Sequence, residues 1–348
     1  MNEPQFLRPS PLDLKEHIEI DSSYSPEEAV SLAIKGQAFL ITDSWRTGSA
    51  IQKLLEKEFF VKSDSPSRTE IQAARKKLAE VSRLFAVRVQ KWNAVIENAP
   101  DNGFLKILYP EMLDFYLGFG DLQELVRAWN YFNTGVMMPS LGFKLHPFYG
   151  TYLPSRMAHI ELFTTWLKTY EGKRNTAVDT GCGSGILALN LARSSFRKVF
   201  ATDINPNACE SLRRDLALHP EIGSVVVKNC DLLSGVKEMC DLIVFNPPWV
   251  VGSPLGILDS ALFYEGDLFE RFFKSARPRL LPGGRVVMLF SSVSTLVQPD
   301  VPHPLEKELE NKRFRLVQKL ERRAKTDKKV SVMKKSAEKV ELWELAVL

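Results

Sequence analysis

The 348-residue sequence contains little cysteine and no long apolar run. Its four cysteines, Cys182, Cys209, Cys230 and Cys240, form no C-x-x-C pair and show no metal-ligand spacing with the five histidines. This usage argues against a disulfide framework and against a zinc site, so we expect free thiols and no metal. No stretch approaches the roughly 18 continuous apolar residues of a membrane span, and the first twenty residues lack a signal-peptide core. We therefore expect a cytoplasmic protein with no membrane partner.

Strong net charge is also absent. The formal net charge is +4, which by itself does not imply binding to nucleic acid. The charge is uneven, however: from Asn311 to Leu348, 12 Lys and Arg stand against 5 Asp and Glu, a net charge of +7. The basic stretch 321–339 is consistent with phosphate contacts and equally with a solvated surface hairpin.

The first part of the chain has the patterns of helices. These helical patterns lie in residues 25–41, 69–99 and 121–132. Ser25 followed closely by two glutamates is a typical helix start. Apolar residues recur at helical spacing from Ile71 to Leu84. We expect a helical N-terminal domain over residues 1–140, a candidate for substrate recognition.

From residue 141 to residue 348 the pattern changes to short β-rich runs alternating with helical ones. Such alternation predicts a parallel sheet covered by helices on both faces, an α/β fold. The last two runs leave no room for a crossover helix and predict an antiparallel pair at one sheet edge. The expected strands are 176–181, 198–203, 224–229, 241–246, 285–292, 314–323 and 339–348.

A glycine-rich loop follows the first of these strands. The strand ends near Asp179, and Gly181, Gly183 and Gly185 precede a helix. Alternate glycines let a backbone turn tightly and approach a ligand, and the carboxyl ends of strands are where open α/β sheets bind ligands. The dinucleotide fingerprint fails because Ile186 occupies its third glycine position, and the Lys-Ser/Thr of a P-loop is absent.

The remaining pattern, Asp-x-Gly-x-Gly-x-Gly, resembles the first motif of class I S-adenosylmethionine-dependent methyltransferases. The resemblance implies a Rossmann-like seven-stranded sheet with its last strand antiparallel. It also implies that Asp179 and the three glycines hold the amino-acid end of the cofactor S-adenosyl-L-methionine. Asp203 ends the second strand, where the family binds the ribose hydroxyls, and Asp231 follows the third strand, where the family binds the adenine amino group.

The fourth strand ends in Asn246-Pro247-Pro248-Trp249, which resembles the Asn-Pro-Pro-aromatic motif of methyltransferases acting on planar nitrogens. Such a nitrogen is a poor nucleophile because its lone pair is delocalised. The Asn246 oxygen and the Pro247 carbonyl would accept its N–H bonds and hold it in line with the methyl group. The prolines would make the corner rigid, and Trp249 would offer an aromatic face on which the planar acceptor could stack. The alternative reading of this motif is a rigid turn with the tryptophan packed inward.

More narrowly, residues 141–348 resemble the small-domain group, which includes HemK-type glutamine methyltransferases and several ribosomal RNA methyltransferases. The closest resemblance is to a bacterial subgroup with the same NPPW sequence. In HemK-type enzymes a Pro-Arg-Pro segment lines the site; here only Pro154 and Arg156 match it, and Tyr152 is a further candidate substrate residue. His159 reads as a helix-surface residue.

We therefore predict a methyltransferase that modifies a planar amino or amide nitrogen. A nucleobase in RNA is the favoured acceptor, because of the basic C-terminal stretch and Trp249. A protein glutamine is the alternative, and a non-catalytic cofactor-binding scaffold is the second alternative.

Overall fold

The computed structural model describes residues 5–60, 68–154, 157–256, 259–324 and 338–348. The chain folds into two compact units. The main unit comprises Met1–Leu7 and Thr134–Leu348, and the inserted unit comprises Arg8–Asn133. The chain thus leaves the main unit after Leu7 and returns to it at Thr134.

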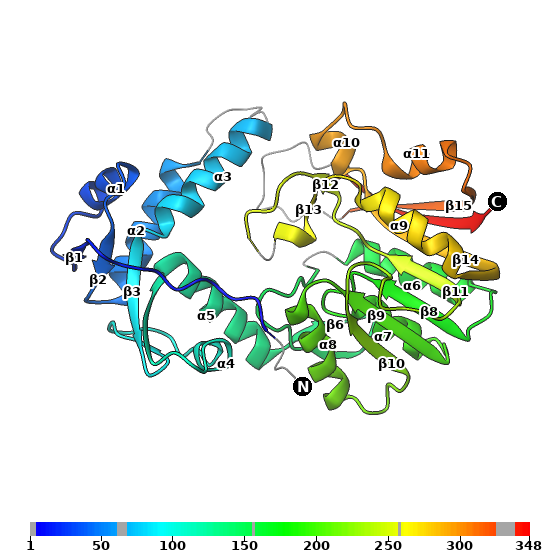
Figure 1. The fold of residues 1–348 in the computed structure, drawn as a ribbon, viewed down its shortest axis with the longest axis horizontal. Helices are drawn as coiled ribbons and strands as arrows, with labels where there is room; N and C mark the ends of the chain where they lie inside the picture. The colour runs from blue at the N-terminus through cyan, green and yellow to red at the C-terminus, as the bar shows by residue number, and fades with distance from the viewer. Residues whose placement is uncertain (1–4, 61–67, 155–156, 257–258, 325–337) are drawn as a thin grey trace. The chain divides into compact units, whose positions relative to one another are not determined.

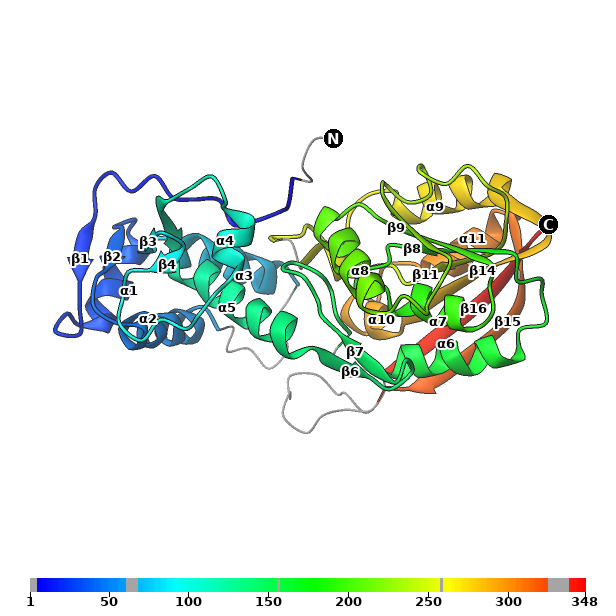
Figure 2. The ribbon, with the colours of Figure 1, turned by 90° about the horizontal axis from the view of Figure 1, so that it is seen from below.

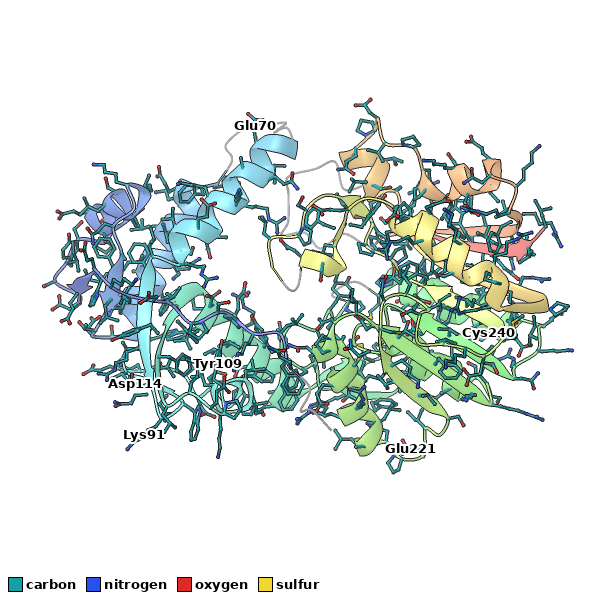
Figure 3. The ribbon with its side chains drawn as sticks, viewed as in Figure 1. Glu70, Lys91, Tyr109, Asp114, Glu221 and Cys240 are labelled. Atoms are coloured by element: carbon teal, nitrogen blue, oxygen red, sulfur yellow. The ribbon has the colours of Figure 1, made fainter. Side chains whose placement is uncertain are left out.

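The inserted unit contains a five-stranded mixed sheet with helices. Strands β1, β2 and β3 are parallel, and β3 pairs antiparallel with both β4 and β5. In its core the rings of Phe39 and Phe85 stack with centroids 5.2 Å apart. Tyr109, labelled in Figure 3, is buried and donates its hydroxyl to the carbonyl of Pro9 at 2.7 Å. The elements are β1 (Ile18–Ile20), α1 (Pro26–Ile34), β2 (Phe39–Ile41), α2 (Trp45–Glu58), α3 (Arg68–Ser82), β3 (Phe85–Gln90), β4 (Asn93–Ala94), α4 (Phe104–Leu108), β5 (Asp114–Gly118) and α5 (Phe119–Thr134).

Helices are present where the sequence predicted them, but strands separate them. Ser25 is the N-cap of α1, and its hydroxyl accepts from the N–H of Glu28 at 3.2 Å. The helices expected over 25–41 and 69–99 end early, because residues 39–41 and 85–90 form strands β2 and β3. Short apolar runs of this length do not distinguish a buried strand from a helix by their period. The N-terminal part is therefore helical but also contains a sheet that the sequence analysis did not anticipate.

The main unit is built on a seven-stranded sheet (Figure 1). The strand order is β10-β9-β8-β11-β14-β16-β15. Strand β16 runs antiparallel to both β14 and β15, whereas the pairs from β10 to β14 are parallel. This confirms the predicted α/β class with an antiparallel last strand. The strands are β8 (Thr176–Thr180), β9 (Lys198–Asp203), β10 (Val225–Asn229), β11 (Cys240–Phe245), β14 (Leu280–Ser291), β15 (Phe314–Arg323) and β16 (Lys339–Val347).

Helices cover both faces of this sheet, as Figure 2 shows. Leu242 and Val244 of β11 join a core with α6, α7 and α8. Ile243 and Phe245 point to the opposite face and join a core with α9 and α11. Successive side chains of a strand alternate between faces, so a central strand covered on both sides is apolar throughout. The helices are α6 (Ala158–Thr169), α7 (Ile186–Arg193), α8 (Pro206–Leu218), α9 (Leu268–Ala276) and α11 (Pro304–Glu310).

Smaller elements complete the main unit. A hairpin pairs β6 (Val136–Met138) with β7 (Phe143–Leu145). Beyond β11, the short strand β12 (Val250–Val251) pairs in parallel with β13 (Phe263–Tyr264). Helix α10 (Val293–Val297) follows β14 directly. In the described ranges, no helix is both long and apolar enough to cross a membrane.

Candidate active site

A cavity of about 610 Å³ opens at the carboxyl ends of the central strands of the main unit. Its lining comes from the loops after β8, β9, β10 and β11, which is where open α/β sheets bind ligands. The volume falls within the range of small-molecule and cofactor sites. Ten of the site residues predicted from the sequence line it: Tyr152, Pro154, Gly181, Gly183, Asp203, Asp231, Asn246, Pro247, Pro248 and Trp249.

The glycine loop adopts a backbone that other residues would strain. Gly181, Gly183 and Gly185 have φ of +63°, +50° and +78°, the left-handed region where a β-carbon is costly. A β-carbon on Gly185 would lie 2.4 Å from the Leu212 side chain. Gly181 and Gly183 line the cavity, whereas Gly185 is the N-cap of α7 and lies outside the lining.

Residues 149–152 begin in a turn, in which Gly150 has a φ of +71°, and contact the glycine loop. The Asn207 amide donates to the carbonyl of Tyr149, and the Asn205 amide donates to the carbonyl of Gly150, each at 2.8 Å. The N–H of Ser184 in the loop donates to the carbonyl of Tyr152 at 3.2 Å. These bonds fix Tyr152 at the cavity. Arg156, the third candidate substrate residue beside Tyr152 and Pro154, lies outside the described residues.

Asp203 connects the glycine loop to the end of β9. One carboxylate oxygen accepts from the N–H of Gly183 and the other from the N–H of Asn205, both at 2.8 Å. Burial raises its pKa, against the opposing effect of these backbone bonds. Asp203 lines the cavity and each carboxylate oxygen can accept more than one hydrogen bond, so the carboxylate can hold the loop and accept from a ligand together.

Asp179 does not reach the cavity. It is fully buried beneath the loop, where one oxygen accepts from the N–H of Ala188 at 2.8 Å and the other has no hydrogen-bond partner. Burial raises the pKa of this carboxyl to about 8. Its position makes Asp179 a support for the first turn of α7. The sequence-based assignment of a direct cofactor contact has no counterpart in the cavity lining.

Asp231 lines the cavity after β10, as expected, and its carboxylate is already paired with another residue of the cavity. Its carboxylate forms an ion pair with Arg271 of α9, which also lines the cavity and pairs with Asp267 at 2.9 Å. Arg271 therefore competes with any ligand group that Asp231 binds. The sequence analysis did not identify this arginine.

The Asn246–Trp249 corner follows β11, whose six residues are all buried. The side-chain oxygen of Asn246 is buried without a hydrogen-bond partner. Native structures leave few buried polar atoms unpaired, and unpaired ones are frequent at ligand sites. Trp249 is partly buried and packs against both cores of the sheet. One part of its indole is therefore fixed in the protein while the residue still lines the cavity.

His159 in the first turn of α6 also belongs to the cavity. It is 2% exposed, lines the cavity, and has an unpaired Nε2. Its ring stands perpendicular to that of Trp249, with centroids 5.6 Å apart. Burial lowers its pKa to about 4, so it is neutral at pH 7. The expectation of a helix-surface histidine was wrong, because the His159 side chain is buried and lines the cavity.

Several residues of the site escaped the sequence analysis. Asn205 carries a readable signal, since Asn-Pro is a typical helix start and Asn205 is indeed the N-cap of α8. Its bond to Gly150, 55 residues away, could not be read from the sequence. Of the described residues, no cluster of three or more His, Cys, Asp or Glu side chains could hold a metal ion.

Part of the chain is similar to known methyltransferases. Residues 160–319 match the family described as the methyltransferase small domain. Ribosomal RNA small subunit methyltransferase C of Actinobacillus pleuropneumoniae is 36% identical over 115 residues, covering 32% of this chain and 31% of that protein. A Methanocaldococcus jannaschii protein named as an N5-glutamine methyltransferase is 28% identical over 129 residues, covering 35% of this chain and 64% of that protein.

Among solved structures, a ribosomal protein L11 methylase from Lactobacillus delbrueckii subsp. bulgaricus is 19% identical with a TM-score of 0.41. The match covers 58% of this chain and 83% of that one. The chain spans about a third of the first curated relative and less than two thirds of the second. Over residues 160–319, which include the glycine loop and the Asn246–Trp249 corner, the sequence matches a methyltransferase small domain.

Proposed function

We propose that this protein transfers a methyl group from S-adenosylmethionine to a planar amino or amide nitrogen. The observation that carries the proposal is the pairing of two motifs at one cavity. The glycine loop after β8 and the Asn246–Trp249 corner after β11 both line it, and their strands are neighbours in the sheet. A scaffold that only bound a cofactor would not need a rigid corner that presents an unpaired amide oxygen.

The residues present suit S-adenosylmethionine. This cofactor carries a cationic sulfonium, a ribose diol and an adenine amino group. The described cavity lining contains four carboxylates, those of Asp203, Asp231, Glu265 and Glu338, against the single arginine Arg271. An acidic lining favours a positively charged ligand. Asp203 would accept hydrogen bonds from the ribose diol and Asp231 from the adenine amino group. Gly181 and Gly183 have no side chain, so the cofactor could lie directly against the backbone of the loop.

When bound, S-adenosylmethionine would supply a methyl group: a nitrogen–carbon bond would form as the carbon–sulfur bond breaks, the thioether product would leave, and the nitrogen would release one proton to solvent. The protein's task is then to orient the acceptor nitrogen. The Asn246 oxygen and the Pro247 carbonyl would each accept one N–H, which aims the lone pair at the methyl group and favours the pyramidal transition state. The fixed φ of the prolines holds both acceptors in place beforehand.

Trp249 would present its cavity-facing surface to the planar acceptor. Its packing against both cores holds the indole in one orientation. A rigid aromatic surface binds a planar group with little loss of side-chain entropy, because few rotatable bonds have to be fixed. Tyr152 and Pro154 would contribute to the same part of the cavity.

RNA is the favoured substrate. The ribosomal RNA methyltransferase with 36% identity supports a nucleobase acceptor. The basic stretch 321–339, which would add phosphate contacts, lies mostly outside the described residues. A protein glutamine is the second candidate, supported by the relative from M. jannaschii. Both acceptors offer a planar nitrogen, so the same corner suits either.

Calorimetric titration with S-adenosylmethionine and with its demethylated product tests the cofactor. Micromolar binding is expected. A methyl-transfer assay with labelled S-adenosylmethionine would then compare RNA and protein fractions from cells that lack the gene. Label in RNA, with binding to bulk RNA that weakens as salt is raised, supports the nucleobase; label in one protein supports glutamine. Absence of cofactor binding would refute the proposal.

A further inference from the structure

The strands β12 and β13, which follow the Asn246–Trp249 corner, form one wall of the cavity. Val250 of β12 and Phe263 and Tyr264 of β13 all line it. The two strands are joined by bonds from the N–H of Val250 to the carbonyl of Leu262 at 3.2 Å and from the N–H of Gly252 to the carbonyl of Tyr264 at 2.9 Å. We refer to these two strands as the β12–β13 wall. A two-stranded sheet this short is marginally stable alone and needs further support.

The side chain of Gln298 supplies that support. Its Oε1 accepts from the N–H of Val251 at 3.0 Å, and its Nε2 donates to the carbonyl of Val251 at 2.9 Å. Gln298 is 6% exposed, so both bonds are shielded from water. One planar amide thus satisfies both backbone groups that Val251 turns away from β13. It takes the place of a third strand beside β12.

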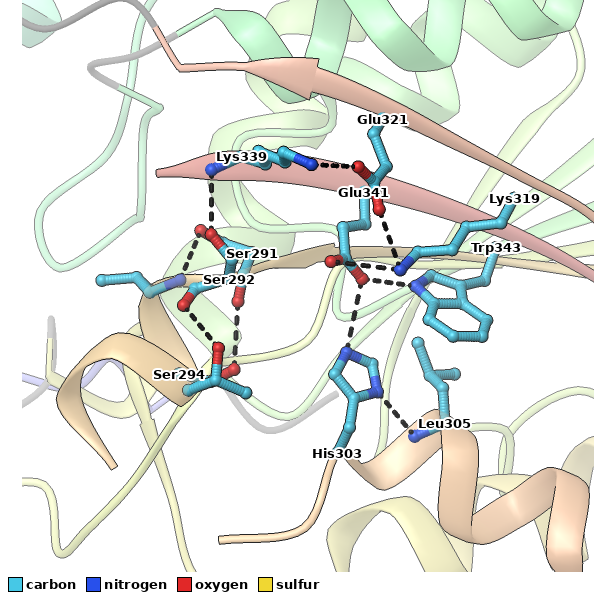
Figure 4. Close-up of polar contacts among 12 residues, drawn as sticks. Ser291, Ser292, Ser294, His303, Leu305, Lys319, Glu321, Lys339, Glu341 and Trp343 are labelled. Atoms are coloured by element: carbon cyan, nitrogen blue, oxygen red, sulfur yellow. Dashed lines mark hydrogen bonds and ion pairs between the residues drawn. The ribbon is translucent and has the colours of Figure 1, made fainter. Parts of the chain in front are cut away.

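Gln298 is itself tied to the central sheet. It is the C-cap of α10, and its N–H donates to the carbonyl of Ser294 at 2.8 Å. Ser294 donates its hydroxyl to the carbonyl of Ser291, the last residue of β14, at 3.1 Å (Figure 4). Strand β14 pairs with β11, with Met288 opposite Phe245. The corner is therefore fixed to the sheet on both sides, through β11 before it and through Gln298 after it.

We propose that Gln298 is a positioning residue for the methyl acceptor. By holding Val251, two residues after Trp249, it sets the orientation of the indole and the position of the wall against which the acceptor lies. This inference rests on the proposed methyl-transfer function. It assigns Gln298 no part in holding the cofactor, because the glycine loop, Asp203 and Asp231 belong to other strands.

The test replaces Gln298 by methionine, which keeps the length of the side chain and removes both hydrogen bonds. Without the amide, the buried N–H and carbonyl of Val251 lose their partners. The β12–β13 wall should therefore shift until these two groups can form hydrogen bonds with water. Methyl transfer to RNA from cells lacking the gene should fall about 10- to 100-fold, since small displacements of a reacting group cost that much. The Kd for S-adenosylmethionine should stay within about twofold of the wild-type value.

A second measurement reports on the wall without requiring activity. Hydrogen exchange of the Val251 amide, followed by mass spectrometry, should become at least about tenfold faster in Gln298→Met, because that N–H has lost its partner. Gln318→Met is the matched control. Gln318 lies on β15, outside the cavity lining, and its amide donates to Glu344 at 2.6 Å. This control should leave transfer and Val251 exchange unchanged.

Three results would overturn the inference. Unchanged exchange in Gln298→Met would show that the amide does not hold the wall. Faster exchange with unchanged transfer would show that the wall does not position the acceptor. A parallel loss of cofactor affinity would show a general structural role. Failure of the wild-type protein to methylate any RNA or protein fraction would refute the proposed function and with it the positioning role, while the exchange measurement would still report whether Gln298 holds the wall.

Discussion

The carboxylate of Asp203 accepts a hydrogen bond from the backbone N–H of Gly183 at 2.8 Å. The acid that ends β9 thus fixes the glycine loop that follows β8. Replacing Asp203 by alanine removes a support of the loop and the acceptor that we propose for the ribose. Hydrogen bonds to charged groups contribute about 1.5–3 kcal/mol, so cofactor affinity should fall by about 10- to 100-fold.

Calorimetry with S-adenosylmethionine measures this loss. Asp114→Ala is the control, because Asp114 pairs with Arg88 in the inserted unit and should leave cofactor affinity unchanged. Wild-type affinity in Asp203→Ala would contradict the assignment.

Asn246→Ala should separate turnover from cofactor binding. The alanine cannot accept the N–H of the acceptor, so methyl transfer should fall about 100-fold or more. Cofactor affinity should remain nearly unchanged, because the removed amide orients the methyl acceptor and does not hold the cofactor. Single-turnover transfer measured beside calorimetry tests this. Asn311→Ala, at the C-cap of α11, is the control. An equal loss of transfer and of cofactor affinity would argue against a positioning role for Asn246.

His159 should make the main unit less stable at mildly acidic pH. Its pKa is about 4 in the folded protein, lowered by burial, against 6.5 when unfolded. Between these values the unfolded chain binds the extra proton, so stability is full above pH 6.5 and falls as the pH drops toward 4. The loss over this interval is about 3 kcal/mol.

Melting temperatures at pH 7 and pH 4.5 measure this effect. In His159→Gln, which does not titrate, the drop between the two pH values should be smaller by several degrees. Equal drops in the two proteins would mean that His159 does not control acid stability.

The ionised Glu341 carboxylate should stabilise the folded protein until the pH falls below about 4.5. Figure 4 shows its carboxylate among Trp343, Lys319 and His303. Burial alone would raise its pKa, but the contact with His303 at 3.4 Å, the hydrogen bond from Trp343 and the charge of Lys319 outweigh burial and lower it to about 2. The Trp343 bond measures 2.7 Å. This stabilisation is present above pH 4.5 and is lost as the pH falls toward 2.

Glu341→Gln should therefore lower the melting temperature by several degrees at pH 7, with a difference that narrows below about pH 4. The exposed neighbour Glu321 also pairs with Lys319, at 3.0 Å, and Glu321→Gln should change the melting temperature much less. A difference between wild type and Glu341→Gln that is constant over the whole pH range would contradict this account.

The sequence predicted the main unit well because its signals are local. Each strand from 176 to 246 is a short apolar run followed by a glycine, an acid or an asparagine, and these polar ends meet at one sheet edge in any parallel fold. Asp203, Asp231 and Asn246 could therefore be assigned to one site. In the inserted unit, the apolar runs 39–41 and 85–90 are too short for their period to distinguish a strand from a helix, so their helical or extended state depends on tertiary packing.

Contacts across long sequence distances could not be predicted. Nothing local marks His159 as buried, because the residue that it faces, Trp249, is ninety positions later. Gln298 likewise reads as a polar residue after a short helix, and only the folded chain brings it to Val251. The same holds for Arg271, whose pairing with Asp231 spans 40 residues.

The return of the chain at Thr134 has a consequence for biosynthesis. Asn207 accepts from the N–H of Leu7 at 2.9 Å and donates to its carbonyl at 2.7 Å. The two residues are 200 positions apart, which at usual translation speeds means about 10–40 s between their emergence from the ribosome. The inserted unit is complete at Asn133 and can fold during that interval. Leu7 can form its contact with Asn207 only after Asn207 has emerged. The inserted unit can therefore fold on the ribosome before the main unit is complete.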